Sequence, residues 1–127
     1  MNVGKGAQRI SATDAVAMAT AALSVAGAGE DTAHAQAAHL VEAELRGHPS
    51  HGLRRLPILV ERMRAGLIEP NARPTFTWGA DSALTVDGNH GFGPVTAEAR
   101  RKATESAVSA ATIRGIDLDG RDRFLDR

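Results

Sequence analysis

Apolar positions recur every three or four residues in successive stretches of the N-terminal half, which is the period of amphipathic helices. The first helix is expected to begin at Ser11–Asp14, where a hydroxyl cap precedes an acid by three residues, and to stop near Gly27. The second is expected to begin at Glu30–Thr32 and to stop at Gly47. The positions predicted to be buried are Val16, Met18 and Leu23 in the first helix, and Ala33, Ala37, Leu40, Val41 and Leu45 in the second.

A third helical segment contains Pro57, which would remove a hydrogen bond from a helix interior. We expect a short turn over residues 51–55, followed by a helix with Pro57 in its first turn and its end at Gly66. One kinked helix is the alternative. The predicted apolar side consists of Ile58, Leu59, Met63 and Leu67.

Strand-like residues follow a linker at residues 69–74. Thr75–Trp78 and Ala83–Asp87 are expected to pair as a hairpin through residues 79–82. A glycine-rich turn then leads into a helix from Pro94 to about Val108. The predicted fold class is therefore α+β, with three amino-terminal helices, a short β-hairpin and a further helix.

The two ends of the chain have a different character. Residues 1–10 are expected to form a flexible arm, residues 11–108 the folded portion, and residues 109–127 a charged tail. With 127 residues the chain is at most one domain. Its apolar content is rich in alanine, which buries little area, so the core is expected to be thin and to need a partner surface or further sequence.

Composition excludes several classes of protein. Fifteen basic and fifteen acidic residues argue against capture by nucleic acid or an anionic membrane. The absence of cysteine excludes a disulfide scaffold, a thiol nucleophile and a cysteine-based zinc site. No stretch approaches the roughly 20 apolar residues of a membrane span. The sequence therefore predicts a cytoplasmic protein.

Candidate chemistry is concentrated between Arg46 and Pro57. Ser50, His51 and Arg55 suit a small carboxylate that exchanges a proton, because arginine binds carboxylates bidentately and histidine titrates near neutral pH. The alternative is a structural role, with Ser50 as a helix cap, His51 exposed and Arg55 solvated. His48 and His51, joined by His90, form a weaker alternative as a zinc site, although our prediction is that no metal binds.

A second candidate is the turn containing Gly88, Gly91 and Gly93, which follows a strand and precedes a helix. Backbone amides in such a turn can bind a phosphate, so these glycines are candidate cofactor-binding residues. The spacing G-x-x-G-x-G differs from the dinucleotide fingerprint, and a tight connection is the alternative.

These motifs together resemble one family. Glu44–Pro57, with its Gly-His-x-Ser-His-Gly-x-x-Arg block, is followed by Val60–Ile68, Asn71–Pro74 and the Asp-Gly-x-x-Gly-x-Gly turn of Val86–Val95. This order is similar to the amino-terminal region of the malate/L-lactate dehydrogenase family, which includes ureidoglycolate dehydrogenase and cyclic imino acid reductases. The resemblance covers about residues 10–108.

The resemblance implies an oxidoreductase that uses NAD or NADP. Its substrates would be small 2-hydroxy and 2-oxo acids or related imino acids, and the full-length family implies a homo-oligomer. Ser50 and His51 would be catalytic, Arg55 would bind the substrate carboxylate, and His48 would lie behind them. The resemblance also implies part of the malate/L-lactate dehydrogenase-like fold.

The chain departs from the family in length and in its last residues. Family members are far longer, and no histidine follows His90 to act as the expected acid or base. We therefore expect a truncated and inactive fragment. The alternative is a non-enzymatic helical module that docks on a full-length relative.

Overall fold

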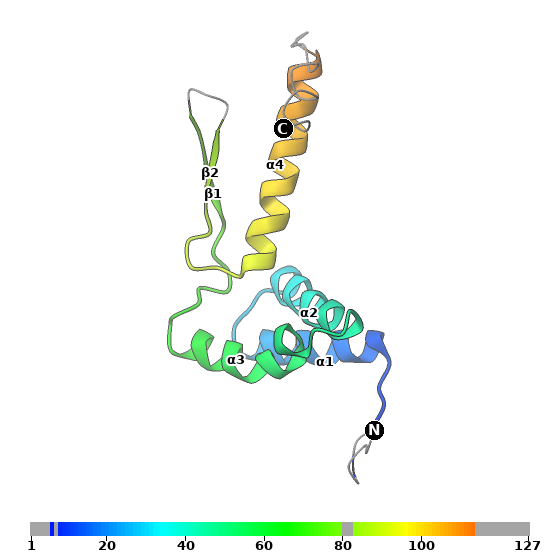
Figure 1. Ribbon diagram of the computed structural model, residues 1–127. Helices are drawn as coiled ribbons and strands as arrows, with labels where there is room; N and C mark the ends of the chain where they lie inside the picture. The colour runs from blue at the N-terminus through cyan, green and yellow to red at the C-terminus, as the bar shows by residue number, and fades with distance from the viewer. Residues whose placement is uncertain (1–5, 7, 80–82, 114–127) are drawn as a thin grey trace. The chain divides into compact units, whose positions relative to one another are not determined.

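The computed structural model describes residues 6, 8–79 and 83–113 (Figure 1). The elements are α1 (Ala12–Val25), α2 (Glu30–Leu45), the 3₁₀ turns η1 (Pro49–His51) and η2 (Leu53–Arg55), α3 (Leu56–Arg64), β1 (Thr75–Trp78), β2 (Leu84–Asp87) and α4 (Gly93–Ile113). Three helices, a hairpin and a further helix confirm the predicted α+β class. The chain divides into two compact units, residues 1–96 and 97–127, so α4 begins in the first unit and continues in the second.

The ends of the first helices follow the predicted signals. The Ser11 side chain accepts a hydrogen bond from the Asp14 N–H at 3.0 Å and so caps α1. Gly47 ends α2 with a φ of +77°, and the N–H groups of Gly47 and His48 donate to the carbonyls of Glu44 and Ala43 at 3.0 and 2.8 Å. Gly27 and Gly66 end α1 and α3 in the same way.

An alanine-rich core joins α1, α2 and α3, as predicted. Leu23 and Leu40 are its largest fully buried side chains, and Phe92 reaches the same cluster from the turn after β2. Burying a phenylalanine stabilises a fold by about 1.5–3 kcal/mol. Phe92 therefore fixes the beginning of α4 against the helices.

Several predicted core positions are wrong. Met18 is 64% exposed because α1 buries Ala15, Ala19 and Leu23, a stripe with a spacing of four on which Met18 does not lie. Leu45, the last residue of α2, is also exposed. On the third segment Leu59 and Met63 are buried, whereas Ile58 and Leu67 are exposed.

The segment around Pro57 follows the preferred prediction. It forms two 3₁₀ turns and then α3, with Pro57 in the first turn of the helix. The turns are not continuous, because Gly52 between them is extended, with φ −95° and ψ −151°. The alternative of one kinked helix is therefore wrong.

The predicted hairpin is present. β1 and β2 pair antiparallel, with Thr75 opposite Asp87 and Trp78 opposite Leu84. Residues 80–82, which were predicted as part of the connection, lie outside the described residues.

The last helix is longer than predicted, from Gly93 to Ile113 rather than from Pro94 to about Val108. Residues 1–5 and 7 of the predicted arm and residues 114–127 of the predicted tail lie outside the described residues. None of the helices in the described part of the chain has the length and apolar character needed to span a membrane.

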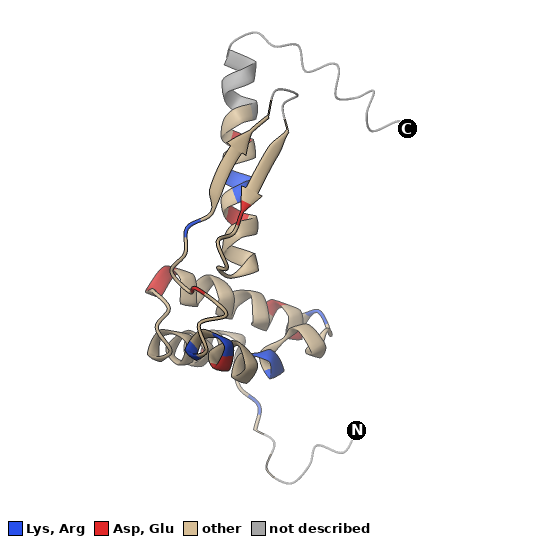
Figure 2. Cartoon of the chain, turned by 90° about the vertical axis from the view of Figure 1, so that its left-hand side faces the viewer, with Lys and Arg blue, Asp and Glu red and all other residues tan. Residues whose placement is uncertain are grey.

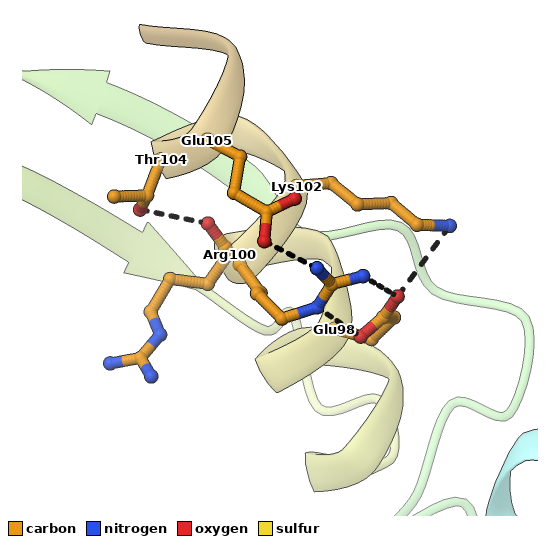
Figure 3. A network of polar contacts seen from close by, with 6 residues as sticks. Glu98, Arg100, Lys102, Thr104 and Glu105 are labelled. Atoms are coloured by element: carbon orange, nitrogen blue, oxygen red, sulfur yellow. Dashed lines mark hydrogen bonds and ion pairs between the residues drawn. The ribbon is translucent and has the colours of Figure 1, made fainter. Parts of the chain in front are cut away.

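Charged residues of both signs occur along the helices (Figure 2). On α4 the Arg101 guanidinium bonds to Glu98 at 2.7 Å and to Glu105 at 2.5 Å, and Lys102 lies 3.8 Å from Glu98 (Figure 3). The hydrogen bond from Arg101 lowers the pKa of Glu98, and the same bond raises the pKa of Arg101. These exposed ion pairs join residues three or four positions apart and stabilise α4 locally.

Candidate functional site

The loop that carries Ser50, His51 and Arg55 is anchored to the end of α2 by Glu44. The half-buried Glu44 carboxylate accepts the Leu53 N–H at 2.9 Å. It passes directly beneath Gly52, where an added Cβ would lie 2.6 Å from the Glu44 Cδ. Glycine at this position therefore lets the carboxylate bond to the backbone between His51 and Arg55.

His51 and Arg55 line one cavity of about 230 Å³. His51 lies on η1 and Arg55 lies on η2. The two side chains therefore line the same cavity without sharing one helical turn. Gln36 and His39 of α2 contribute the other polar side chains, and the apolar wall consists of Leu40, Leu59, Ile68 and Phe92. The turn at Gly91, Gly93 and Pro94 completes the lining.

This cavity suits a small anion. Among the described residues that line it, one is arginine, two are histidines and none is acidic. The Gly93 N–H makes no hydrogen bond to a described residue and stands at the beginning of α4, where backbone N–H groups are unpaired and the helix dipole favours negative charge. The arrangement can hold a carboxylate beside an imidazole.

Ser50 lies behind His51 rather than in this cavity. Its exposed hydroxyl forms a 3.0 Å hydrogen bond with His51 Nδ1, which leaves Nε2 as the nitrogen free to contact a ligand. Ser50 does not cap a helix, because neither 3₁₀ turn nor α3 has a side-chain cap. Its contact therefore orients the imidazole.

His48 belongs to a neighbouring hollow. It lines a second cavity of about 560 Å³ with His39, His51, Glu42 and Arg46. His39 and His51 border both cavities, whereas Arg55 lines only the smaller of these two. His48 therefore does not line the Arg55 cavity.

The three glycines of the turn before α4 differ in their surroundings. Gly91 and Gly93 line the Arg55 cavity, whereas Gly88 does not. A Cβ at Gly88 would meet Thr96 Oγ1 at 2.9 Å, and one at Gly91 would meet the Gly88 carbonyl oxygen at 3.0 Å. Close packing therefore accounts for glycine at 88 and 91, whereas a Cβ at Gly93 would meet no described residue within 4 Å.

The same turn has an unusual backbone. Asn89 and His90 both have positive φ, at 51° and 62°, and the Gly91 N–H closes the turn on Gly88 at 2.9 Å. Asn89 holds it in place by donating from Nδ2 to the Arg73 carbonyl at 2.7 Å. The His90 carbonyl accepts the Glu69 N–H, at 2.9 Å. These bonds fix the residues that lead into α4.

The three-histidine alternative is not supported by the arrangement of the side chains. In the part of the chain that the structure describes, no three His, Asp or Glu residues are grouped closely enough to hold a metal ion. His90 in particular lines neither cavity that contains His51.

Sequence reasoning missed Gln36 and His39. Neither residue was predicted to lie at the site. One signal was available: Gln36 is a polar residue on a face otherwise made of Ala33, Ala37 and Leu40, three residues before His39. The turn before α4 meets this face through residues that are far apart in the sequence, so the sequence pattern did not predict the meeting.

Comparisons with known proteins agree with the motifs. A family model described as malate/L-lactate dehydrogenase matches residues 10–118. The delta(1)-pyrroline-2-carboxylate reductase of Ancylobacter novellus is 36% identical over 110 residues, which are 87% of this chain and 32% of that protein. The L-sulfolactate dehydrogenase of Methanothermobacter thermautotrophicus is 31% identical over 112 residues, which are 88% of this chain and 32% of that protein.

A solved structure shares the fold. The crystal structure of a dehydrogenase from Sinorhizobium meliloti is 40% identical, with a TM-score of 0.76 over 80% of this chain and 32% of that chain. The chain thus spans about 32% of the length of the curated relatives named above. The predicted resemblance is confirmed, and no comparison supports the alternative of a non-enzymatic docking module.

Proposed function

This chain belongs to the malate/L-lactate dehydrogenase family, and on that premise we propose that it supplies the acid-binding part of an oxidoreductase that uses NAD or NADP. The substrates are small 2-hydroxy and 2-oxo acids or related imino acids. The names of its relatives support this class, because they include a sulfolactate dehydrogenase and a pyrroline-2-carboxylate reductase.

The observation that carries the proposal is the shared cavity of His51 and Arg55. Arg55 binds the substrate carboxylate through its planar pair of N–H donors. His51 contacts the oxygen or nitrogen on the reacting carbon through Nε2, because its Nδ1 is bonded to Ser50. Ser50 thus acts by orienting His51, and His48 supports the loop from behind.

The cavity fits a small acid but not a whole dinucleotide. Its volume of about 230 Å³ is below the roughly 300–1,000 Å³ of pockets that enclose drug-sized ligands. Gly91 and Gly93, with Gly88 behind them, contribute at most an edge of a cofactor site. We therefore propose that the chain by itself binds the acid and does not catalyse hydride transfer, which requires a nicotinamide held against the substrate carbon.

We also propose that the protein acts in the cytoplasm as a homo-oligomer. Large apolar side chains, including Met18, Val25 and Leu67, are more than 60% exposed. A second copy of the chain would cover part of this surface. Light scattering on the purified chain at several concentrations tests this, and a concentration-independent monomer contradicts it.

The test of acid binding compares two adjacent arginines. Arg55 lines the cavity and Arg54 does not, although both are exposed residues of η2. Titration of the purified chain with oxaloacetate, followed by NMR, is expected to give a millimolar Kd, which Arg55→Ala weakens at least tenfold and Arg54→Ala leaves within twofold. Equal effects of the two substitutions, or NADH oxidation by the chain alone, would contradict the proposal.

A further inference from the structure

Gln36 is an unpartnered buried side chain at the cavity. It is 5% exposed and is the one polar residue that is buried in the described part of the chain. Its amide forms no hydrogen bond with any described residue, as the side-chain hydrogen bonds of α2 involve other groups. However, no side-chain nitrogen or oxygen atom among those residues is both fully buried and without a hydrogen-bond partner. The amide atoms therefore reach free space, and the space that Gln36 lines is the Arg55 cavity.

No described residue bonds to this amide, so its hydrogen bonds are left to whatever occupies the cavity. The surrounding helix face of Ala33, Ala37 and Leu40 is apolar. A ligand in the cavity can therefore take up these hydrogen bonds. The amide can donate two and accept two, so it can bind a polar group that Arg55 does not use.

The cavity has room for a ligand with two polar ends. Taking about 30 Å³ for each water-sized group, roughly 230 Å³ accommodates about eight non-hydrogen atoms. That is more than a three-carbon acid with one acidic group needs, and it approaches the size of a four-carbon acid with two. With His39 on the same α2 face and no acidic residue in the lining, the Gln36 side of the cavity also suits a negatively charged group.

We propose that Gln36 determines substrate specificity by binding a second anionic group, a carboxylate or sulfonate, on a 2-hydroxy or 2-oxo acid whose first carboxylate binds Arg55. This inference rests on the proposed function and deepens it. The Gln36 amide donates its N–H groups to the second anion, and His39 lies beside it in the lining of the cavity.

The experiment measures the Kd of two acids, malate and lactate, for the full 127-residue chain by NMR titration. Gln36→Met removes the amide while keeping an unbranched side chain of similar length. It is expected to weaken malate binding about tenfold and to change lactate binding by less than twofold. Gln36→Glu, which keeps the size but adds a negative charge, is expected to weaken malate binding further.

Thermal unfolding without ligand separates this role from a structural one. Because the Gln36 amide is unpartnered in the free chain, Gln36→Met is expected to keep or raise Tm. Should Gln36→Met lower Tm and weaken both acids equally, or leave malate binding unchanged, the specificity role is wrong. If Arg55→Ala also leaves both acids bound as before, the proposed function itself fails. Loss of both acids in Arg55→Ala, with no selective effect at Gln36, overturns only this inference.

Discussion

Glu44 and Gly52 are complementary: the carboxylate of one occupies the space that a side chain on the other would fill. The Glu44 Cδ would lie 2.6 Å from a Cβ at Gly52, and Glu44 Oε1 accepts the neighbouring Leu53 N–H at 2.9 Å. This pair holds the turns that carry His51 and Arg55 against α2.

Gly52→Ala is expected to displace the Glu44 carboxylate and break its bond to Leu53. We expect the free energy of unfolding to fall by about 1–3 kcal/mol, as when a buried backbone N–H loses its partner. In a Glu44→Ala background the space is already free, so the same substitution should cost less than half as much. Urea unfolding of the four variants measures this cycle.

Gly79→Ala is the matched control, because the one described residue that a Cβ there would meet is Ala83, at an ordinary contact distance of 3.6 Å. It should change stability by less than about 0.5 kcal/mol. Equal costs of Gly52→Ala in both backgrounds would show that Glu44 does not occupy the space below Gly52.

Asn71 links the linker before the hairpin to the connection between α1 and α2. Its Oδ1 accepts the Gly29 N–H at 2.7 Å, and its Nδ2 donates to the Gly27 carbonyl at 2.9 Å. Asn71→Ala loses both bonds and is expected to lower stability by about 1–2 kcal/mol, or Tm by several degrees. Asn71→Asp keeps the acceptor and should cost less. A Tm unchanged in Asn71→Ala would contradict this link.

Acid is expected to weaken α4 through Glu98. The hydrogen bond from Arg101 lowers the pKa of Glu98 below its usual 4.5 in the folded chain, so the unfolded chain binds the proton more readily. The contribution of this group to stability is therefore complete above pH 4.5 and disappears as the pH falls through the lower, folded value. Circular dichroism at 222 nm between pH 7 and pH 2 measures the loss of helix.

Glu98→Gln removes the titrating carboxyl group. This variant should therefore lose less helix between pH 7 and pH 2 than the unsubstituted chain does. Glu61→Gln is a suitable control, because Glu61 is exposed on α3 and forms no ion pair with a described residue. If both variants lose helix in acid as the unsubstituted chain does, the ion pairs of Glu98 do not contribute to the stability of α4.

Local features of this fold could be predicted from the sequence, whereas long-range ones could not. Ser11 and Gly47 mark helix ends through bonds to residues at most five positions away, so their roles are visible in the sequence. Met18 was wrongly placed in the core because the side of α1 that α2 covers depends on how closely two alanine-rich surfaces approach.

The candidate site shows the same division. The Gly-His-x-Ser-His-Gly-x-x-Arg block predicted His51 and Arg55, and the structure places both at one cavity. Gln36 could not be assigned in the same way, because its partnership with that cavity arises only when Phe92 packs on the helical core and brings Gly91 and Gly93 opposite α2.

The most direct test of the central claim, that the cavity of His51 and Arg55 binds a small organic acid, is a map of ligand-induced NMR shifts. Adding malate to the isotopically labelled chain is expected to shift resonances of His51, Arg55, Gln36 and Gly93. Resonances of Thr13, Ser24 and His34, which line a separate hollow on α1 and α2, should stay unchanged. Shifts confined to that hollow, or none at millimolar malate, would contradict the claim.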